Sequence, residues 1–421
     1  MKLQSIKGMN DILPPCSSTW QHAEELLREI LESYGYRQIR LPIMEHTAVF
    51  KRSIGAVTDI VQKEMYTFED RNGDSISLRP EGTAGCVRAV LEGQLLHQQF
   101  RKLWYIGPMF RHERPQKGRY RQFHQIGVEV FDIPGPDIDA ELIMMTARMW
   151  AELELTDLRL ELNTLGTLEN RTQYRDSLFQ YFTDHRDHLD PDSLSRLDRN
   201  PMRILDSKNP DLRGVIDNAP KLEQYLDQQS RSHFDSLCEM LIGAGIEFQL
   251  NPYLVRGLDY YSNTVFEWVT DRLGAQGTVC AGGRYDGLVE LMGGKPTPAI
   301  GFAMGLERLI ELAEQKLSRG DDADADIYII VAHQDYSGEA LCLAESLRVA
   351  DKKQRVICHC GGGSIKSQMK KADRSGAEFA FIIGQQEHID GTVTIKPLRQ
   401  RAEQITVARD AGISAIAEFS S

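Results

Sequence analysis

The acidic segment SRGDDADAD, at residues 318–326, is the feature that most constrains how this chain of 421 residues can fold. It is polar and nearly free of large apolar side chains, so it cannot contribute to a hydrophobic core and is typical of a linker. We therefore predict a large domain at 1–320, a linker at 321–326 and a smaller domain at 327–421.

The residues after this segment alternate between two patterns. Strands are expected at 327–332, 355–358, 377–383 and 392–396, and helices at 337–349 and 365–375. Strands that alternate with helices predict a small α/β domain.

The larger domain mixes helical and strand patterns. Residues 17–33 carry apolar side chains at helical spacing, and a strand followed by a helix is expected from residue 299. Two strand-like runs, 103–111 and 123–131, are joined by the charged loop HERPQKGRY, which predicts an antiparallel hairpin with a functional tip. Residues 165–249 are polar, helical and broken by NPMRILD and NPDL, so we expect a helical insertion there.

The composition is that of an ordinary globular protein, with 41% hydrophobic and 26% charged residues. No apolar run reaches the roughly 18 residues of a membrane span, and the first residues lack the apolar stretch of a signal peptide. Seven scattered cysteines argue against a disulfide framework and favour a cytoplasmic protein. Cys358, His359 and Cys360 cluster, but no second ligand pair lies nearby, so no metal site is expected.

The net charge of -12 argues against a protein that coats nucleic acid without selectivity. Two segments are nevertheless basic: residues 111–121 hold five Arg or Lys against one Glu, and residues 352–374 hold seven against one Asp. Such runs are often only solvated faces, but the glycines and aromatic or motif residues beside both runs favour contact with phosphate.

Four short motifs place charged side chains between small residues: RPEGT at 79–83, RGLDYY at 256–261, AGGRYDG at 281–287 and GLERL at 305–309. Together with the hairpin loop they supply more charge than a core tolerates unless a charged ligand binds. These charges are Arg79, Glu81, Arg111, Glu113, Arg256 and Arg308. Cations around a triphosphate, and carboxylates for an amine or a metal, are what nucleotidyl transfer requires. The phosphate loop G-x-x-x-x-G-K-[ST] is absent, because its nearest match, GGGSIKS, has Ile365 in place of the second glycine.

These motifs resemble the bacterial type of the histidyl-tRNA synthetase family over essentially the full length of the chain. KGMNDILP resembles the family's opening, FRHERPQKGRYRQFHQ its motif 2 and GFAMGLERL its motif 3, both shared by class II synthetases. RPEGT, NPMRILDSK, RGLDYY and AGGRYDGL resemble the elements specific for histidine.

The resemblance implies an α+β fold, with a class II antiparallel sheet, flanking helices and the helical insertion, followed by a C-terminal α/β anticodon-binding domain. It implies a homodimer that activates L-histidine with ATP, accompanied by Mg²⁺, to histidyl-adenylate and pyrophosphate, and then transfers histidine to the 3′ end of histidine tRNA. An alternative is the histidine-sensing regulatory subunit of ATP phosphoribosyltransferase. The intact motif 2 and the C-terminal domain argue against that alternative. RGLDYY argues against a class II synthetase for another amino acid.

The resemblance also assigns roles to residues. Arg256 and Arg111 are expected to be catalytic. ATP is expected to contact Arg111, Glu113, Phe123 and Arg308. Histidine is expected to contact Glu81, Thr83, Gln125, Glu129, Tyr261, Tyr285 and Arg256. A neutral imidazole has one N–H and one bare nitrogen, so Glu129 is expected to accept from the first and Tyr261 to donate to the second. The acceptor end of tRNA is expected to contact Arg114, Gln116, Lys117 and Arg119, with Gln116 the best candidate for contact with a base.

Overall fold

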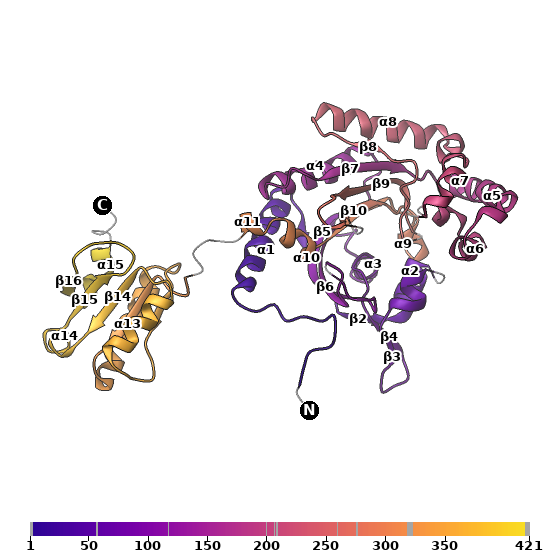
Figure 1. Cartoon of the computed structure of the whole chain (residues 1–421). Helices are drawn as coiled ribbons and strands as arrows, with labels where there is room; N and C mark the ends of the chain where they lie inside the picture. Colours follow the sequence, from indigo (N-terminus) through magenta and orange to yellow (C-terminus); the bar gives the residue numbers. More distant parts are fainter. Residues whose placement is uncertain are drawn as a thin grey trace. The chain divides into compact units, whose positions relative to one another are not determined.

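The chain divides into two units, Met1–Ser318 and Arg319–Ser421 (Figure 1). The computed structural model describes residues 3–55, 58–116, 118–198, 200–205, 207, 209–258, 260–274, 277–317 and 323–416. Within these residues, none of the helices combines the length and the apolar character that crossing a membrane requires.

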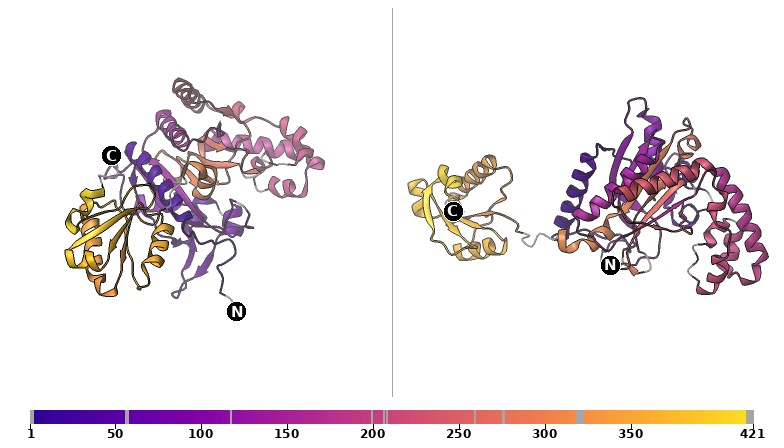
Figure 2. Two further views of the ribbon diagram at one scale, coloured as in Figure 1. Left: turned by 60° about the vertical axis from the view of Figure 1, so that its left-hand side comes forward. Right: turned by 90° about the horizontal axis from the view of Figure 1, so that it is seen from above.

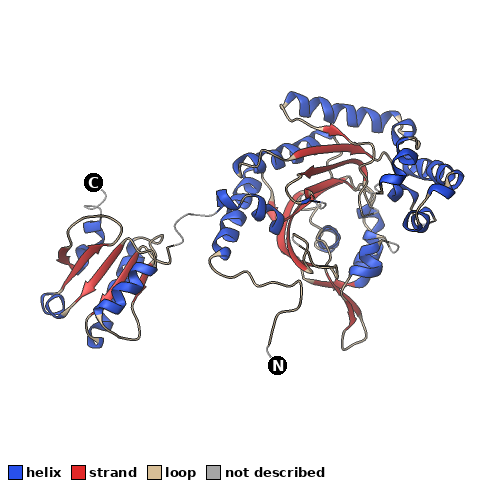
Figure 3. Ribbon diagram, viewed as in Figure 1, coloured by secondary structure: helices blue, strands red, loops and turns tan. Residues whose placement is uncertain are grey.

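The first unit is built on an eight-stranded sheet with the order β1-β5-β6-β11-β10-β9-β7-β8 (Figure 3). Its strands are β1 (Arg37–Gln38), β5 (Lys102–Phe110), β6 (Gln122–Phe131), β7 (Arg159–Thr164), β8 (Gln249–Leu250), β9 (Ser262–Val269), β10 (Thr278–Arg284) and β11 (Ala299–Gly305). Neighbours are antiparallel except at the two edges, where β1 pairs with β5 and β8 pairs with β7 in parallel. The predicted hairpin is present as β5 and β6, which pair from Lys102↔Val130 to Phe110↔Gln122.

The two faces of this sheet are covered by different layers, because side chains alternate along each strand. Trp104 of β5 packs in a core with helices α1 (Cys16–Ser33), α4 (Pro136–Glu152) and α10 (Leu306–Leu312). Its neighbour Tyr105 points into a second core, which also contains residues of α3 (Thr83–Glu92) and of the insertion. The functional site described below lies on this second face.

The helix expected after β11 is in two pieces, α10 and α11 (Glu314–Leu317), which are separated at Ala313. The remaining elements of the first unit, outside the insertion, are α2 (Thr47–Ile54), a π-helical turn η1 (Ile60–Glu64), α9 (Leu288–Leu291) and a small sheet of order β2-β4-β3. The strands of the small sheet are β2 (Met44–His46), β3 (Thr67–Glu69) and β4 (Ser75–Leu78).

The insertion is helical, as expected. Its elements are α5 (Leu168–Asp184), η2 (Arg186–His188), α6 (Pro191–Leu197), η3 (Pro201–Ile204), η4 (Pro210–Leu212), α7 (Arg213–Asp217), η5 (Leu222–Tyr225) and α8 (Gln228–Gly243). Side chains of Thr167, Asp190 and Asp227 cap three of its helices by accepting backbone N–H groups. Helices α5 to α7 gather on the side of the unit away from α1 in all views (Figures 1 and 2). Helix α8 buries Leu237 and Leu241 in the core of the main sheet, so the insertion ends as part of that core.

The second unit is a five-stranded sheet with the order β13-β12-β14-β15-β16. Its strands are β12 (Ile327–Val331), β13 (Val356–Cys358), β14 (Phe379–Ile383), β15 (Thr392–Pro397) and β16 (Ile405–Ala408). Its helices are α12 (Ser337–Ala350), α13 (Ile365–Arg374), α14 (Gln385–Asp390) and α15 (Gly412–Ile416), with short turns η7 (Gln334–Tyr336) and η8 (Arg409–Ala411). Strand β12 lies inside the sheet, between β13 and β14, and is buried throughout, which explains its unbroken apolar sequence.

Of the predicted linker at 321–326, residues 321 and 322 lie outside the described part, as do residues 318–320 before it. Its last residue is already built into the second unit. Asp326 Oδ1 pairs with Arg355 Nη2 at 2.6 Å, and the backbone N–H of Asp324 donates to Ser375 O. The last residue of the acidic segment, Asp326, therefore belongs to the C-terminal domain, where it forms an ion pair.

Candidate active site

A cavity of about 350 Å³ lies against the second face of the main sheet. Eleven of the residues expected from the sequence line it: Glu81, Thr83, Arg111, Glu113, Arg119, Phe123, Gln125, Arg256, Tyr261, Tyr285 and Arg308. They come from the turn before α3, the tip of the β5–β6 hairpin, β6, the loop before β9, the turn after β10 and the start of α10. Segments far apart in the sequence thus converge on one site.

Four arginines line the cavity and bring positive charge into a confined space: Arg111, Arg119, Arg256 and Arg308. Arg111 Nε donates to Pro80 O at 2.9 Å, and its guanidinium lies 5.3 Å from the centre of the Phe123 ring. Arg308 Nε donates to Gly118 O at 3.0 Å. Burial, together with the charges of Arg119 and Arg111, lowers the pKa of Arg308. Guanidinium groups that disfavour one another in this way form a site for an anion.

Arg256 forms an ion pair with Glu267 of β9 and stands over the Tyr261 ring, 5.6 Å from its centre. The other carboxylate oxygen of Glu267 accepts from Thr278 Oγ1 at 3.0 Å. This pair holds the guanidinium at the wall of the cavity.

Three buried polar atoms of the lining have no hydrogen-bond partner within the described part of the chain: Glu113 Oε2, Gln125 Oε1 and Arg256 Nε. Glu113 Oε2 still forms an ion pair with Arg119, which leaves Gln125 Oε1 and Arg256 Nε as the two of interest. An unsatisfied buried polar group costs about 1–3 kcal/mol, so such atoms point to a ligand that completes them. One is an acceptor and the other a charged donor. This combination suits the ammonium and the carboxylate of an amino acid.

Glu129 lies directly behind the lining and is almost fully buried. Its Oε1 accepts from Thr83 Oγ1 at 2.7 Å and from the Tyr105 hydroxyl at 2.9 Å, and its Oε2 accepts from the Tyr285 hydroxyl. Burial raises the pKa of Glu129 to about 8, although the three hydroxyl donors oppose this rise. Gly301 lies opposite Glu129 on β11, and a Cβ there would collide with the Glu129 carboxylate. Because Gly301 also lines the cavity, the carboxylate lies immediately against its wall.

The contact of Tyr105 with Glu129 was not predicted from the sequence, where Tyr105 is one apolar residue of an expected strand. A signal was nevertheless present, since Tyr105 pairs with Gly127 across the hairpin and lies on the same face as Glu129. The lack of a side chain at Gly127 leaves room for the tyrosine ring to reach the carboxylate.

Glu81 caps helix α3. Its carboxylate accepts the backbone N–H groups of Thr83 at 2.6 Å and Ala84 at 3.0 Å, and burial raises its pKa. Arg79, which the sequence groups with the ligand-binding charges, has a structural role. Its guanidinium donates to Pro108 O at 2.8 Å and to Leu41 O at 3.0 Å, away from the cavity.

The hairpin tip joins the cavity to the surface. Arg119 pairs with Glu113, and the backbones of Gln116 and Arg119 bond to each other. Arg114 and Gln116 are exposed and do not contribute to the described lining of the cavity. Lys117 lies outside the described residues.

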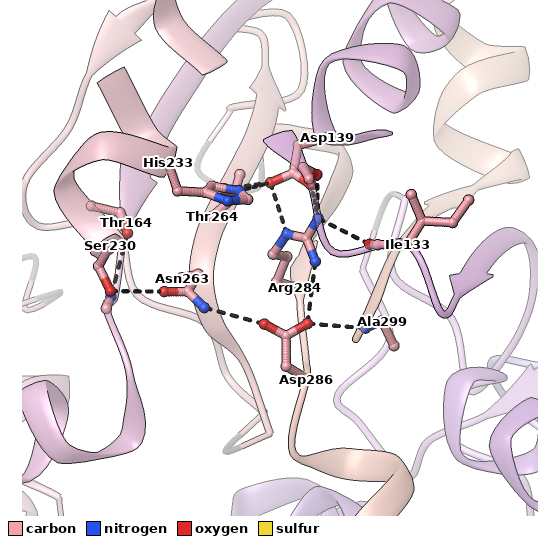
Figure 4. A network of polar contacts seen from close by, with 12 residues as sticks. Ile133, Asp139, Thr164, Ser230, His233, Asn263, Thr264, Arg284, Asp286 and Ala299 are labelled. Atoms are coloured by element: carbon pink, nitrogen blue, oxygen red, sulfur yellow. Dashed lines mark hydrogen bonds and ion pairs between the residues drawn. The ribbon is translucent and has the colours of Figure 1, made fainter. Parts of the chain in front are cut away.

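Arg284 of AGGRYDG is not part of the described lining of the cavity, and Figure 4 shows its side chain pointing to Asp139. It is buried and pairs with Asp139 of α4, with Nη2 at 2.7 Å from Oδ1 and Nε at 3.0 Å from Oδ2. The same carboxylate accepts from Thr264 Oγ1 at 2.6 Å and lies 2.8 Å from His233 Nε2 of α8. Asp286 accepts from Arg284 and from the backbone N–H of Ala299.

This network therefore fixes both neighbours of Tyr285. Its charged groups serve as a frame for the pocket and not as ligands.

The Cys358–His359–Cys360 cluster of the second unit is structural at its centre. Tyr328 OH and His359 Nδ1 are 2.9 Å apart, and His359 Nε2 lies 2.8 Å from Gly362 O. A ring with both nitrogens engaged in this way cannot ligate a metal ion without breaking a contact.

Comparison with known proteins places these sites in context. The family model described as "Histidyl-tRNA synthetase" matches residues 8–309, and the model described as "Anticodon binding domain" matches residues 326–419. A curated histidine–tRNA ligase of Halorhodospira halophila is 59% identical over 397 residues, which cover 94% of this chain and 93% of that protein.

Solved structures agree on the fold. The crystal structure of the apo histidyl-tRNA synthetase of S. aureus has a TM-score of 0.82 at 33% identity and covers 98% of this chain and 99% of its own. A Bacillus halodurans structure described as an ATP phosphoribosyltransferase regulatory subunit/histidyl-tRNA synthetase has a TM-score of 0.64 at 22% identity, with coverage of 91% and 98%. That second likeness shows the fold alone. The predicted α+β fold with a C-terminal anticodon-binding domain is confirmed.

Proposed function

Because the chain belongs to the histidyl-tRNA synthetase family, we propose that the cavity on its main sheet activates L-histidine with ATP. The chain is a histidine–tRNA ligase, as the sequence predicted. We propose in addition the use of ATP and Mg²⁺ and a role for each residue of the cavity.

The strongest support comes from Gln125 Oε1 and Arg256 Nε, which have no hydrogen-bond partner among the described residues. Both residues line the cavity together with Arg111 and Arg308. The amino acid's ammonium would donate to Gln125, and its carboxylate would accept from Arg256. The α-phosphate of ATP would lie between Arg256 and Arg111, and the γ-phosphate at Arg308. Attack of the carboxylate on the α-phosphorus forms histidyl-adenylate and releases pyrophosphate.

The chemistry asks for positioning more than for proton transfer. The attacking carboxylate is ionised at neutral pH, so no general base is needed. Arg256 and Arg111 would hold the two reactants and stabilise the negative charge that develops on the α-phosphate. The adenine ring would stack on Phe123, and Glu113 would accept from its exocyclic amine.

Mg²⁺ would arrive bound to the phosphate oxygens of ATP. In the described part of the chain no three His, Cys, Asp or Glu side chains form a group that could hold a metal. Magnesium that is held mainly by nucleotide phosphates is consistent with its preference for retaining water and phosphate ligands.

The imidazole would be recognised at the back of the cavity. In its ionised form the Glu129 carboxylate has roughly four acceptor positions. Thr83, Tyr105 and Tyr285 occupy three of them, so ionised Glu129 would have one left for the imidazole N–H. The hydroxyl of Tyr261 would donate to the bare ring nitrogen. Glu81 and Thr83 would complete the contacts to the amino group. A wrong amino acid would leave these buried groups unpaired, which supports strong discrimination without editing.

Transfer to tRNA would follow at the same site. Arg114, Gln116, Lys117 and Arg119 of the hairpin tip would contact the acceptor end, and the C-terminal domain would bind the anticodon. We also propose that the protein is a cytoplasmic homodimer, as its family implies. Sedimentation of the full chain tests the dimer.

The Bacillus halodurans structure described as a regulatory subunit/histidyl-tRNA synthetase is 22% identical to this chain, so it lends no weight to the alternative of a histidine-sensing regulatory subunit. The intact motif 2 sequence and the match to an anticodon-binding domain favour the ligase.

Exchange of labelled pyrophosphate into ATP tests the proposal. We expect exchange to require histidine and Mg²⁺, and the other amino acids to support none above background. Exchange without histidine, or with several amino acids alike, would contradict the assigned pocket.

A further inference from the structure

The segment NPMRILDSK of the insertion makes a contact for which the catalytic steps above do not account. Arg203, on the short turn η3, donates from Nη2 to the backbone carbonyl of Gly257 at 2.9 Å. Gly257 directly follows Arg256. The insertion thus touches the chain one residue from the proposed catalytic guanidinium.

Arg203 is itself held from two sides. Its Nη1 lies 3.4 Å from Asp59 Oδ2, just before the turn η1, and its own carbonyl accepts from Arg196 Nη1 at 3.0 Å. Turn η1 is hydrogen-bonded to the hairpin tip, because the backbone carbonyl of its last residue, Glu64, accepts the N–H of His112. Arg203 therefore joins the insertion, the segment beside the hairpin and the Arg256 loop.

A second arginine of the insertion forms a hydrogen bond with the other end of the same loop. Arg171 of α5 donates from Nη1 to the carbonyl of Tyr261. Between these two carbonyls, the described residues of the loop belong to no helix or strand. A loop without a ladder of its own depends on such outside donors for its conformation.

We infer that Arg203 is a positioning residue for Arg256, and that Arg171 does the same for Tyr261. The inference rests on the role proposed above for Arg256. A guanidinium donor to a carbonyl is a charge-assisted hydrogen bond, which is stronger than a neutral one. Without it the loop gains freedom, and a displacement of about 1 Å at a reacting group is enough to slow catalysis strongly.

The same contacts contribute little to overall stability. Arg203 retains 24% of its side-chain exposure and its partner Asp59 retains 55%, so solvent screens the ion pair. A positioning role therefore predicts a loss of activity without a matching loss of stability. A contact with tRNA phosphate would instead affect charging and leave the tRNA-free reaction intact.

The test measures histidine-dependent pyrophosphate exchange by the full chain without tRNA, in Arg203→Ala, Arg203→Lys and Arg171→Ala. Arg175→Ala is the matched control, because Arg175 lies on α5 and pairs only with its exposed neighbour Asp176 among the contacts of the described chain. We expect Arg203→Ala to lower kcat about tenfold or more, with the KM for ATP and the melting temperature nearly unchanged. Arg203→Lys should rescue little, because a lysine cannot bridge both acceptors with a planar fork. Arg171→Ala should mainly raise the KM for histidine.

A double variant separates the inference from the role of Arg256. If Arg203 acts through Arg256, adding Arg203→Ala to Arg256→Ala should cause little further loss of kcat. Exchange by Arg203→Ala at the rate of the control, or equal losses in both backgrounds, would overturn the inference and leave the proposed function standing. Normal exchange by Arg256→Ala would overturn both.

Discussion

Tyr105 and Glu129 meet across the β5–β6 hairpin, where the tyrosine hydroxyl donates to Glu129 Oε1 at 2.9 Å. With Thr83 and Tyr285, this contact places three hydroxyl donors on one buried carboxylate. Burial also raises the pKa of Tyr105 and Tyr285 well above 10, so both phenols keep their protons. The donor array is therefore constant with pH, and Glu129 is the group that titrates.

The first prediction concerns pH and stability. Burial raises the pKa of Glu129 from 4.5 to about 8, so between these values the folded state binds a proton that the unfolded state has released. The contribution of Glu129 to the free energy of unfolding is then complete below about pH 4.5 and is lost as the pH rises toward about 8. Glu129→Gln should remove this dependence in urea unfolding from about pH 5 to about pH 8. A wild-type-minus-variant difference that stays constant over this range would contradict it.

The second prediction concerns histidine selectivity. Tyr261→Phe removes one hydroxyl from the proposed imidazole contact, so kcat/KM for histidine should fall by about 1–3 kcal/mol in activation free energy. The KM for ATP should change little. Tyr181→Phe is the matched control, because its hydroxyl donates to Val215 O inside the insertion. Equal losses for histidine and ATP would instead indicate a packing role for Tyr261.

The third prediction concerns the frame behind Tyr285. Asp139→Asn would remove the buried countercharge of Arg284 and leave its guanidinium only the partly exposed Asp286, and should destabilise the first unit by about 3–5 kcal/mol in urea unfolding. The exposed pair of Asp271 with Arg159 has similar bidentate geometry, so Asp271→Asn is the control and should have little effect. Similar midpoints for the two variants would argue against a stabilising frame.

The fourth prediction concerns the second unit. Lys366 and Lys370 are exposed one turn apart on α13, after three glycines with positive φ. If they contact tRNA phosphates, replacing both with Ala should lower charging of histidine tRNA and reduce its dependence on salt. Pyrophosphate exchange should be unaffected. Lys396→Ala on β15 serves as a control for the loss of a single surface charge. Unchanged charging by the double variant at low and high salt would exclude this helix as the contact.

The strands and helices could be predicted because their apolar patterns are local. The hairpin at β5 and β6, helix α1 and the α/β order of the second unit follow from spacing alone. Elements with weak patterns were missed, such as the short strand β16 with only part of its residues buried. The N-terminal helix α1 begins at Cys16, one residue from its expected start.

The directions in which individual side chains point were harder to predict than the strands and helices. The sequence of AGGRYDG alone does not show which of its side chains faces the cavity, because the register of β10 shifts between Gly283 and Arg284. Gly283 has a φ of +155° and approaches Thr264 O too closely for a side chain. This irregularity sends Arg284 to Asp139 and Tyr285 to Glu129. Likewise, only the tertiary fold brings Arg203 to Gly257, because the two residues are far apart in sequence.

The most direct test of the account is histidine-dependent pyrophosphate exchange by Arg256→Ala beside wild type. Arg256 is proposed to hold the histidine carboxylate and to stabilise the charge on the α-phosphate, so its loss should slow exchange by about 10²-fold or more. Arg256→Lys should restore little, because the bidentate fork is lost. A folded Arg256→Ala protein that exchanges pyrophosphate at nearly the wild-type rate would contradict the account.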